Sequence, residues 1–410
     1  MAGAAMSGEP LRVEMVSRRV HPAHGPGGME RKVFDLATRL AGRGVEVALF
    51  TETPADLGRA AAASAAMPDG VVINWVPGRW LPIGDRKGTV VLDRISNYPM
   101  WARRAARWMV RARDLPPAVV HAHGLATWGF VHTGAGAPLV MSVEGLEEFE
   151  LPGGLKRALY VPFRRRMRRS AAVADAVVAT DRALQPVVER HLGIPVAAQR
   201  MIPNAVDPSA CRAIGDAARG RALLERVGLG GAAPLFVSVG RMEANKGFDV
   251  LARAFARADA ELPAGWAWVL VGEGPQRSAV EQAAAGIAAR VRFAGGLPDV
   301  ELHSLLAAAD WFVHPTLFEG SSLVTLEAMA HGRPVIAGRA GGLPDKVIDG
   351  VSGFLVEPGD EAALAGALLR ATRVNGAAMG EAGRRHCEEN FSWDAVIDRY
   401  VDLYRTLAAA

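Results

Sequence analysis

Short apolar runs alternate with helical stretches along the chain, and this alternation constrains the fold more than any other feature of the sequence. Parallel strands need a crossover connection, usually a helix, so the pattern predicts an α/β fold. A strand over 11–17 comes first, and a helix that ends at Gly42 and Gly44 follows it. The apolar positions at helical spacing are Val33, Phe34, Leu36, Ala37 and Leu40. Further strands are expected at 45–51, 71–76, 118–124, 138–143, 176–180 and 199–203.

The same pattern occurs a second time after residue 233. Strands are expected there at 234–240, 267–272, 290–295, 311–315 and 334–338. The preceding segment 207–233 is small, polar and glycine-bearing, and it is interpreted as a linker. A chain of 410 residues also exceeds what one hydrophobic core usually organises. We therefore predict two doubly wound, Rossmann-like domains over 1–205 and 206–390, with an amphipathic helix in 391–410 that packs back across both.

Composition argues against several other classes of protein. Half of the residues are hydrophobic and 22% are charged, as in an ordinary globular protein. The sequence has no apolar stretch near the roughly 20 residues that cross a bilayer, and residues 1–10 lack the layout of an export signal, so a cytoplasmic location is expected. Cys211 and Cys387 lie far apart in the sequence, which predicts neither a disulfide framework nor a cysteine metal cluster.

Positive charge is concentrated in the first half of the chain. Residues 1–205 contain 27 Lys and Arg against 18 Asp and Glu, whereas the rest contains 20 against 25. The basic segments 101–114 and 155–171 also carry aromatic and apolar residues, so peripheral contact with an anionic membrane is one interpretation. Arginine-rich composition and ordinary solvated helix faces are the alternative explanation. Nucleic acid is not an expected partner, because no nucleic-acid-binding motif accompanies the charge.

The densest functional signal is HPTLFEGSSLVTLEAMAHGRPVIAG over 314–338, where Glu319 and Glu327 are eight positions apart. The strand before it leads to the carboxyl edge of the sheet, where open α/β proteins bind ligands. Glu319 is still in the loop and is expected to point at the group beyond a diphosphate. Glu327 is about one turn inside a helix and is expected to bind a vicinal diol such as a ribose. The alternative is that Glu319 caps the helix and Glu327 is a solvated helical residue.

A helix begins between these two glutamates. It is opened by the small residues Gly320, Ser321 and Ser322, which let a diphosphate come close to unpaired backbone N–H groups and to the positive end of the helix dipole. We expect Ser322, Leu323 and Val324 to present their amides to the phosphates.

A second signal lies upstream, in FVSVGRMEANKGFDVLARAFA over 236–256. A strand is followed by Gly240 and Arg241, and Lys246 comes five positions after the arginine. Two cations beside a leaving nucleoside diphosphate would stabilise the transition state more than the ground state. A surface arginine and lysine in an ordinary strand–helix loop are the alternative.

These segments resemble glycosyltransferase family 4, which carries a Glu-x7-Glu element running into LEAMAHGRPVIA and, upstream of it, Gly-Arg-x4-Lys-Gly. The resemblance covers nearly the whole chain and implies the GT-B fold, in which two Rossmann-like domains face each other across a cleft. It also implies retaining transfer of a sugar from a nucleotide-diphosphate donor, UDP- or GDP-linked. The donor would bind the C-terminal half, and an acceptor hydroxyl on a glycan, a lipid-linked compound or a small molecule would bind mainly the N-terminal half.

Neither a metal nor another cofactor is expected. The sequence contains no Asp-x-Asp triplet, which would supply the metal clamp of the other major glycosyltransferase fold. Arg241, Lys246 and the helix amides would therefore balance the diphosphate charge.

The same resemblance implies further donor contacts at several glycines and one leucine. Those beside the nucleobase are Gly272, Gly274, Gly295 and Leu297, and those beside the phosphates are Gly27 and Gly28. Taken alone, each of these positions is a tight turn between a strand and a helix. Asn204 matches the hinge strand of the family and is expected to hold the domain junction.

Family members often place a histidine near the donor sugar, after an N-terminal strand. His121 and His123 share one face of the strand 118–124, and His123 is the candidate contact, with a packed core histidine as the alternative. At the next strand end, many relatives have a histidine before a glycine, but this chain has Glu144 before Gly145. This departure puts a histidine contact there in doubt, and it offers a carboxylate that could bind an acceptor hydroxyl or amine.

Two other classes of function stay open from the sequence. A nucleotide-sugar epimerase or a phosphorylase on the same fold is the enzymatic alternative, although no lysine site for pyridoxal phosphate is recognisable. A non-catalytic nucleotide-sugar-binding partner protein is the other alternative. The presence of Glu319, Arg241 and Lys246 argues against it.

Overall fold

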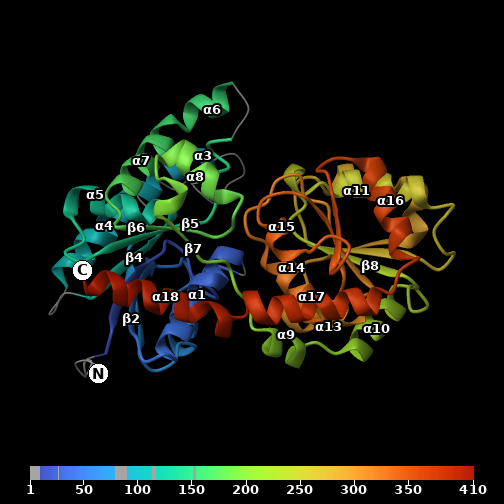
Figure 1. Ribbon diagram of the computed structural model, residues 1–410, viewed down its shortest axis with the longest axis horizontal. Helices are drawn as coiled ribbons and strands as arrows, with labels where there is room; N and C mark the ends of the chain where they lie inside the picture. Colours follow the sequence, from blue (N-terminus) through green and yellow to red (C-terminus); the bar gives the residue numbers. More distant parts are fainter. Residues whose placement is uncertain (1–9, 26, 79–89, 113–116, 151–153) are drawn as a thin grey trace. The chain divides into compact units, whose positions relative to one another are not determined.

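The computed structural model describes residues 10–25, 27–78, 90–112, 117–150 and 154–410. Nearly all of the segment 1–10, which was interpreted as lacking an export signal, lies outside these ranges, as do residues 113 and 114 of the basic segment 101–114. The chain forms two compact units, each built on one parallel sheet (Figure 1). The N-terminal unit runs to Ile202 and includes Ile397–Ala410, whereas the C-terminal unit is Pro203–Val396.

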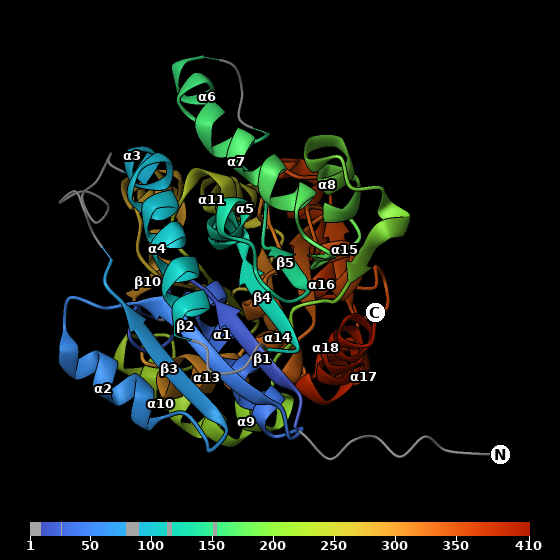
Figure 2. The same cartoon turned by 90° about the vertical axis from the view of Figure 1, so that its left-hand side faces the viewer.

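The sheet of the N-terminal unit has seven parallel strands in the order β3-β2-β1-β4-β5-β6-β7 (Figure 2). Their bounds are β1 Arg12–Val16, β2 Glu46–Glu52, β3 Val71–Val76, β4 Val119–His123, β5 Leu139–Val143, β6 Ala176–Ala179 and β7 Gln199–Met201. The strands predicted from the sequence are confirmed. The strand order reverses between β1 and β4, and open α/β sheets bind ligands at such a switch point.

Nine α-helices of the described residues belong wholly or partly to this unit. They are α1 Gly28–Ala41, α2 Leu57–Ala65, α3 Val90–Ile95, α4 Asn97–Arg111, α5 Phe130–Thr133, α6 Leu155–Leu159, α7 Val161–Ala172, α8 Leu184–Leu192 and α18 Trp393–Ala408. Short 3₁₀ turns occupy Gly124–Gly129 and Val196–Ala198. The basic segment 155–171 falls on two helices, α6 and α7.

The C-terminal unit has a six-stranded sheet in the order β10-β9-β8-β11-β12-β13, again parallel. The strands are β8 Leu235–Val239, β9 Ala267–Val271, β10 Val291–Gly295, β11 Trp311–His314, β12 Val335–Gly338 and β13 Gly353–Val356. The helices are α9 Pro208–Ile214, α10 Ala217–Arg226, α11 Phe248–Ala258, α12 Arg277–Ala283, α13 Asp299–Ala308, α14 Leu323–Ala330, α15 Leu343–Lys346, α16 Glu361–Ala371 and α17 Gly376–Phe391, with 3₁₀ turns at Ala244–Lys246 and Ala285–Arg290. The doubly wound fold is confirmed, and β13 is the strand that the sequence did not predict.

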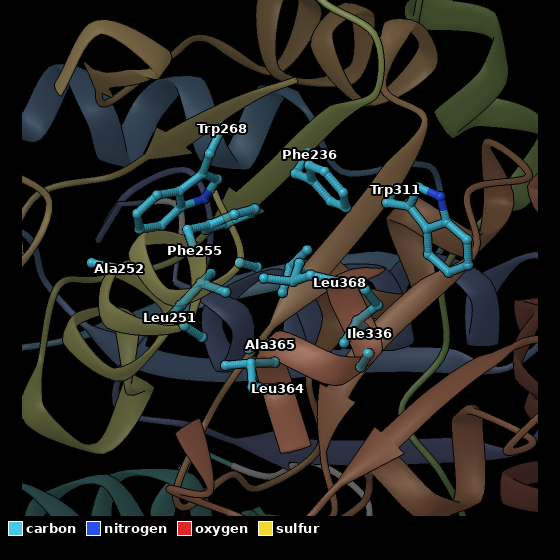
Figure 3. Packing of buried hydrophobic residues seen from close by; sticks show 14 of the residues in the cluster. Phe236, Leu251, Ala252, Phe255, Trp268, Trp311, Ile336, Leu364, Ala365 and Leu368 are labelled. Carbon is cyan, nitrogen blue, oxygen red and sulfur yellow. The ribbon is translucent and has the colours of Figure 1, made fainter. Parts of the chain in front are cut away.

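Strand alternation divides the interior of this unit into two cores. Along β8, Phe236 enters one core, while Leu235 and Val237 enter the other. The first core gathers large aromatic rings, and Phe255 of α11 stacks on Trp268 with ring centroids 5.3 Å apart (Figure 3). Because both faces of the sheet are buried, its carboxyl edge is fixed in place. The loops of the candidate site begin at that edge.

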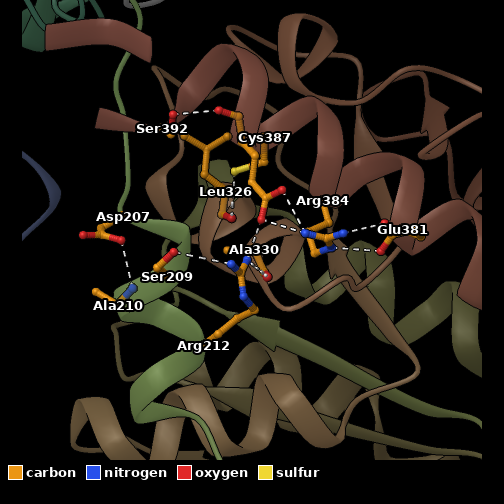
Figure 4. Close-up of polar contacts among 11 residues, drawn as sticks. Asp207, Ser209, Ala210, Arg212, Leu326, Ala330, Glu381, Arg384, Cys387 and Ser392 are labelled. Carbon is orange, nitrogen blue, oxygen red and sulfur yellow. Dashed lines mark hydrogen bonds and ion pairs between the residues drawn. The ribbon is translucent and has the colours of Figure 1, made fainter. Parts of the chain in front are cut away.

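The predicted linker 207–233 is wrong, because most of this segment is helical. Asp207 and Asp216 cap α9 and α10, their side chains accepting hydrogen bonds from backbone N–H groups. Arg212 of α9 donates to the Ala330 carbonyl at 3.3 Å and pairs with Glu388 at 2.8 Å, so α9 is tied to α14 and α17 (Figure 4). The two helices belong to the C-terminal unit, and the sequence analysis did not recognise them because the segment is rich in small and polar residues.

Candidate active site

The loops after β8, β9 and β10 are joined edge to edge by backbone hydrogen bonds. Met242 N–H donates to the Glu273 carbonyl at 2.9 Å, and Gly272 N–H donates to the Gly295 carbonyl at 2.7 Å. Side chains would not fit between these loops. A Cβ on Gly272 would lie 2.0 Å from the Gly240 carbonyl oxygen, and one on Gly274 would lie 2.4 Å from the Met242 carbonyl oxygen. These glycines therefore allow the three loops to approach one another closely.

We predict that Gly272→Ala destabilises the C-terminal unit by about 2 kcal/mol or more, because φ is +129° there and the added methyl group meets the Gly240 carbonyl. The matched control is Gly366→Ala in α16, where a Cβ meets nothing within 4 Å. That control should leave stability unchanged or raise it by up to about 1 kcal/mol. Thermal unfolding of both variants measures the difference, and equal melting temperatures would contradict the prediction.

Glu319 is held by two partners in the loop after β11. Its Oε2 accepts hydrogen bonds from Lys246 Nζ and from His314 Nε2, each at 2.7 Å. The carboxylate side chain is 12% exposed. Burial raises the pKa of Glu319, but His314 and Lys246 outweigh it and lower the pKa to about 2. The structure therefore brings Glu319 into direct contact with Lys246, a pairing that the sequence analysis did not predict.

His314 was not singled out from the sequence. It is the last residue of β11 and is buried. A histidine five positions before Glu319, at the carboxyl end of a strand, was the available signal.

The helix start expected between the two glutamates is present. Ser322 is the N-cap of α14, and its hydroxyl accepts from Thr325 N–H at 3.3 Å. Leu323 and Val324 are the first helical residues, so helix geometry leaves their N–H groups without intrahelical partners. Glu327 lies one turn further along α14 and is 9% exposed, so it is not a solvated surface residue.

A buried lysine supports the loop before this helix. Lys346 of α15 is 1% exposed, and its ammonium group donates to Ser321 Oγ at 2.8 Å. Asn204 donates from its side chain to the Ser321 carbonyl at 3.1 Å, within the C-terminal unit. Gly341 packs against the Glu319 carbonyl so closely that a Cβ would lie 1.9 Å from the oxygen. Sequence reasoning missed Lys346 and Gly341, because their neighbours come from the fold.

Two predicted donor contacts differ from expectation in their surroundings. Arg241 lies beside Gly240, but its guanidinium pairs with Glu243 at 2.6 Å and its side chain is 77% exposed. Leu297 is half-buried and packs against the core that faces α13 and α14. The structure does not show Arg241 in contact with the Lys246–Glu319 pair.

In the N-terminal unit, the glycine loop opens α1 as expected. Gly27 is the N-cap of this helix and Gly28 is its first residue. The Glu30 carboxylate covers Gly27, since a Cβ there would lie 2.1 Å from its oxygen. An anionic side chain of the protein itself therefore lies at the start of α1.

The two histidines of β4 share one face, which confirms that prediction. Their rings stack with centroids 4.5 Å apart, and both are fully buried. His121 Nδ1 and Nε2 lie 2.7 Å from the Tyr404 hydroxyl and 2.8 Å from Ser142 Oγ. His123 Nδ1 lies 3.1 Å from Glu144 Oε1.

Glu144 is engaged by side chains of its own unit. Lys32 of α1 donates to both of its carboxylate oxygens, at 3.0 and 2.9 Å. Glu144 is therefore held by groups of the protein itself, and its role as an acceptor-binding group stays a prediction. The signal for Lys32 was present in the sequence, because it falls on the same face of α1 as Leu36 and Leu40.

A hollow of about 400 Å³ lies beside the carboxyl ends of β1 and β2. Its lining mixes hydrogen-bond donors and acceptors, including Arg19, His24, Glu52, Asp56 and Arg59. Glu52 is itself paired with the buried Arg18 at 2.7 Å. This mixed lining suits a ligand that carries several hydroxyl groups.

Comparison with known proteins agrees with the fold. A family model described as Glycosyltransferase Family 4 matches residues 26–210, and one described as Glycosyl transferases group 1 matches residues 233–373. The D-inositol 3-phosphate glycosyltransferase of Salinispora tropica is 31% identical, with 96% of this chain and 85% of that protein covered. The chain belongs to glycosyltransferase family 4.

Other similar proteins extend this result. The GDP-mannose-dependent alpha-(1-6)-phosphatidylinositol monomannoside mannosyltransferase of Mycolicibacterium smegmatis is 36% identical, with 55% of this chain and 61% of that protein covered. Sucrose-phosphate synthase from Thermosynechococcus elongatus superposes with a TM-score of 0.74 at 23% identity, covering 98% of this chain and 100% of that one. HepE of Anabaena, in complex with UDP and glucose, superposes with a TM-score of 0.72 at 19% identity, covering 97% of this chain and 100% of that one. The protein is therefore a glycosyltransferase with the GT-B fold.

Within the described ranges, no group of three or more His, Cys, Asp and Glu side chains is arranged to hold a metal ion. None of the described helices is both long enough and apolar enough to cross a membrane.

Proposed function

We propose that this glycosyltransferase moves a sugar from a nucleotide-diphosphate donor, UDP- or GDP-linked, to an acceptor hydroxyl with retention of anomeric configuration. The bond between the anomeric carbon and the diphosphate oxygen breaks, and the acceptor oxygen forms the new bond on the same face of the sugar. The acceptor proton passes to the leaving diphosphate. The group that carries this proposal is Glu319, ionised and fixed between Lys246 and His314.

Glu319 has the charge and the rigidity that the reaction needs. Positive charge spreads over the sugar ring as the glycosidic bond breaks, and a fixed carboxylate stabilises that charge. The carboxylate has two hydrogen-bonding partners, so it needs little reorganisation when the charge develops.

The donor diphosphate would be balanced without a metal. The amides of Leu323 and Val324 at the start of α14, together with the ammonium of Lys246, supply positive potential on the C-terminal unit. Arg241 would leave Glu243 and turn to the diphosphate, which is feasible because its side chain is exposed. Glu327, buried in α14, would bind the ribose diol.

For the acceptor, we propose a polyhydroxylated compound bound by the N-terminal unit. Several relatives are named as D-inositol 3-phosphate glycosyltransferases, and another is named as acting on a phosphatidylinositol monomannoside. The hollow beside β1 and β2 has a polar lining that includes Arg19 and Arg59. These features make a phosphorylated cyclitol the first acceptor to test, with sugars and lipid-linked glycans next.

We also propose peripheral contact with anionic membranes through the segments 101–114 and 155–171, which include α4, α6 and α7. Arg107 and Arg111 on α4 and Arg165 on α7 are exposed, and Trp108 is 42% exposed beside them on α4. Cosedimentation with phosphatidylserine vesicles tests this proposal, and equal binding to neutral vesicles would contradict it.

The experiment that tests the proposed function has two stages. A thermal-shift screen of UDP- and GDP-sugars identifies the donor, because a ligand of the folded state raises the melting temperature. Transfer to cyclitol phosphates, sugars and lipid-linked acceptors is then followed by mass spectrometry, and NMR of the product gives the anomeric configuration. Inversion of configuration, or conversion of the donor into an epimer without an acceptor, would contradict the proposal.

Lys246→Ala and Arg241→Ala are each expected to weaken binding of the nucleoside diphosphate by about 10–100-fold, because each removes a charge-assisted hydrogen bond. Isothermal titration calorimetry measures this loss. Arg253→Ala is the matched control, since Arg253 is an exposed cation of the same unit that pairs with Asp249 and Glu361. Unchanged affinity in both site variants would refute their roles.

A further inference from the structure

A buried charge in the N-terminal unit has no part in the chemistry proposed above. Lys32 is 1% exposed and lies on the buried face of α1, which also carries the core residues Leu36 and Leu40. Its Nζ donates to both oxygens of Glu144, at 3.0 and 2.9 Å. Burial disfavours the ammonium group, but Glu144 and Tyr400 together outweigh this effect and raise the pKa of Lys32. The lysine is therefore charged inside the unit.

Glu144 also determines which nitrogen of His123 carries a proton. Its Oε1 lies 3.1 Å from His123 Nδ1. An ionised carboxylate only accepts hydrogen bonds, so Nδ1 must be the protonated nitrogen. In the neutral ring, Nε2 is then an acceptor. Nε2 is buried and has no hydrogen-bond partner among the described residues. A buried acceptor without a donor points to a ligand hydroxyl, which would reach Nε2 once the atoms that cover it move.

A carboxylate beside a histidine would ordinarily favour the protonated ring. Here Lys32 offsets that effect. Its ammonium group lies beside the same carboxylate, and its positive charge disfavours a second positive charge on His123. Burial and Lys32 lower the pKa of His123 against the raising effect of Glu144, and the net direction is downward. The pKa of Glu144 is held well below its usual range, despite burial, by Lys32 and His123.

None of the other described groups considered around His123 brings a charge that would favour the protonated ring. The His121 ring stacks on it from the same strand. The Tyr98 hydroxyl of α4 donates to the His123 carbonyl at 3.4 Å. From α18, Tyr400 and Tyr404 face His121, and burial raises the pKa of both phenols, so they stay uncharged. Glu144 and Lys32 are therefore the charged pair that sets the state of His123.

We propose that Lys32 is a positioning residue that keeps His123 as the neutral Nδ1–H imidazole, so that Nε2 accepts a hydrogen bond from a substrate hydroxyl. A doubly protonated ring would present a donor at Nε2 and could not accept this bond. The inference rests on the proposed function only for the identity of the hydroxyl. The protonation state itself is a property of the folded protein.

NMR of the whole protein labelled with ¹⁵N-histidine tests the inference directly. The His123 signals are assigned by their loss in His123→Gln. We expect the neutral Nδ1–H tautomer throughout the range of about pH 6–8 in which an ordinary histidine titrates. A wild-type His123 that gains a second proton in this range, or carries its proton on Nε2, overturns the proposal, even if no variant folds.

Lys32→Met removes the charge while keeping an unbranched side chain of similar length. His123 should then titrate at a higher pH than in the wild type, and the acidic limb of the kcat/KM profile should move upward by about one pH unit or more. The second variant, Lys32→Met with Glu144→Gln, removes both charges but keeps an amide oxygen that can accept from Nδ1. It should return the His123 titration toward that of the wild type.

The control is Arg43→Met, which removes an exposed cation paired with Asp398 in the same unit. It should leave both the His123 signals and the pH profile unchanged. A Lys32→Met protein in which the His123 titration stays at its wild-type position overturns the inference. If no donor and acceptor pair gives transfer, the proposed function fails, but the NMR result still decides the role of Lys32.

Discussion

Glu319→Gln is expected to reduce the rate of sugar transfer by about 10²–10³-fold, as does removal of one preorganised electrostatic group from other active sites. The amide has the shape of the carboxylate and can still accept from Lys246, so the loop should keep its conformation. It lacks the negative charge that stabilises the sugar ring in the transition state. Initial rates at saturating donor measure the loss, and calorimetry should show nearly unchanged binding of the nucleoside diphosphate.

Glu357→Gln is the matched control for this prediction. Glu357 is 72% exposed and pairs with Arg339 in the same unit, so its substitution should leave transfer unchanged. A Glu319→Gln enzyme that keeps most of the wild-type rate would remove Glu319 from the chemistry. A variant that also loses nucleotide binding would show that the substitution had disturbed the loop instead.

Glu144→Ala is expected to lower the free energy of unfolding of the N-terminal unit by about 3–5 kcal/mol, because it leaves the buried ammonium of Lys32 without its carboxylate. For a unit of this size the melting temperature should fall by roughly 6–20 °C. Differential scanning calorimetry measures this change. Glu147→Ala, an exposed change in the same loop, should shift stability by less than about 0.5 kcal/mol.

A double variant separates the ion pair from simple loss of packing. Lys32→Met combined with Glu144→Leu removes both charges and fills the site with apolar side chains. Buried ion pairs replaced in this way often lose little stability or none. The double variant should therefore be more stable than Glu144→Ala. If the two substitutions destabilised the protein additively, the ion pair would not explain the loss.

The fold could be predicted largely from the local sequence pattern. The elements that the prediction missed were missed for physical reasons. β13 is an edge strand whose first residue is Gly353, and glycine is disfavoured in strands, so the local pattern there favours a turn. In 207–233, short helices depend on Asp207 and Asp216 as caps and on Arg212 as a tie to α17. Composition alone gives small, polar segments the character of a linker.

The sequence likewise predicted some residues of the candidate site and missed others. Glu319 and Lys246 were identified because both lie in recognisable segments, and the fold brings them to 2.7 Å. Arg241 was identified for the same reason, but its neighbour Glu243 holds it in the structure. His314 and Lys346 were missed because their roles depend on contacts with Glu319 and Ser321.

By itself, the sequence determined the alternation of strands and helices, the two sheets and the glutamate and glycine loops at their carboxyl edges. These features are local, since they depend on residue spacing, helix starts and turns. Only the tertiary structure decided which charges meet. Glu144 became the partner of Lys32, which is 112 positions away, because burial makes an unpaired charge too costly and the fold brings α1 to the end of β5. Such pairings depend on distances between segments that no local pattern contains.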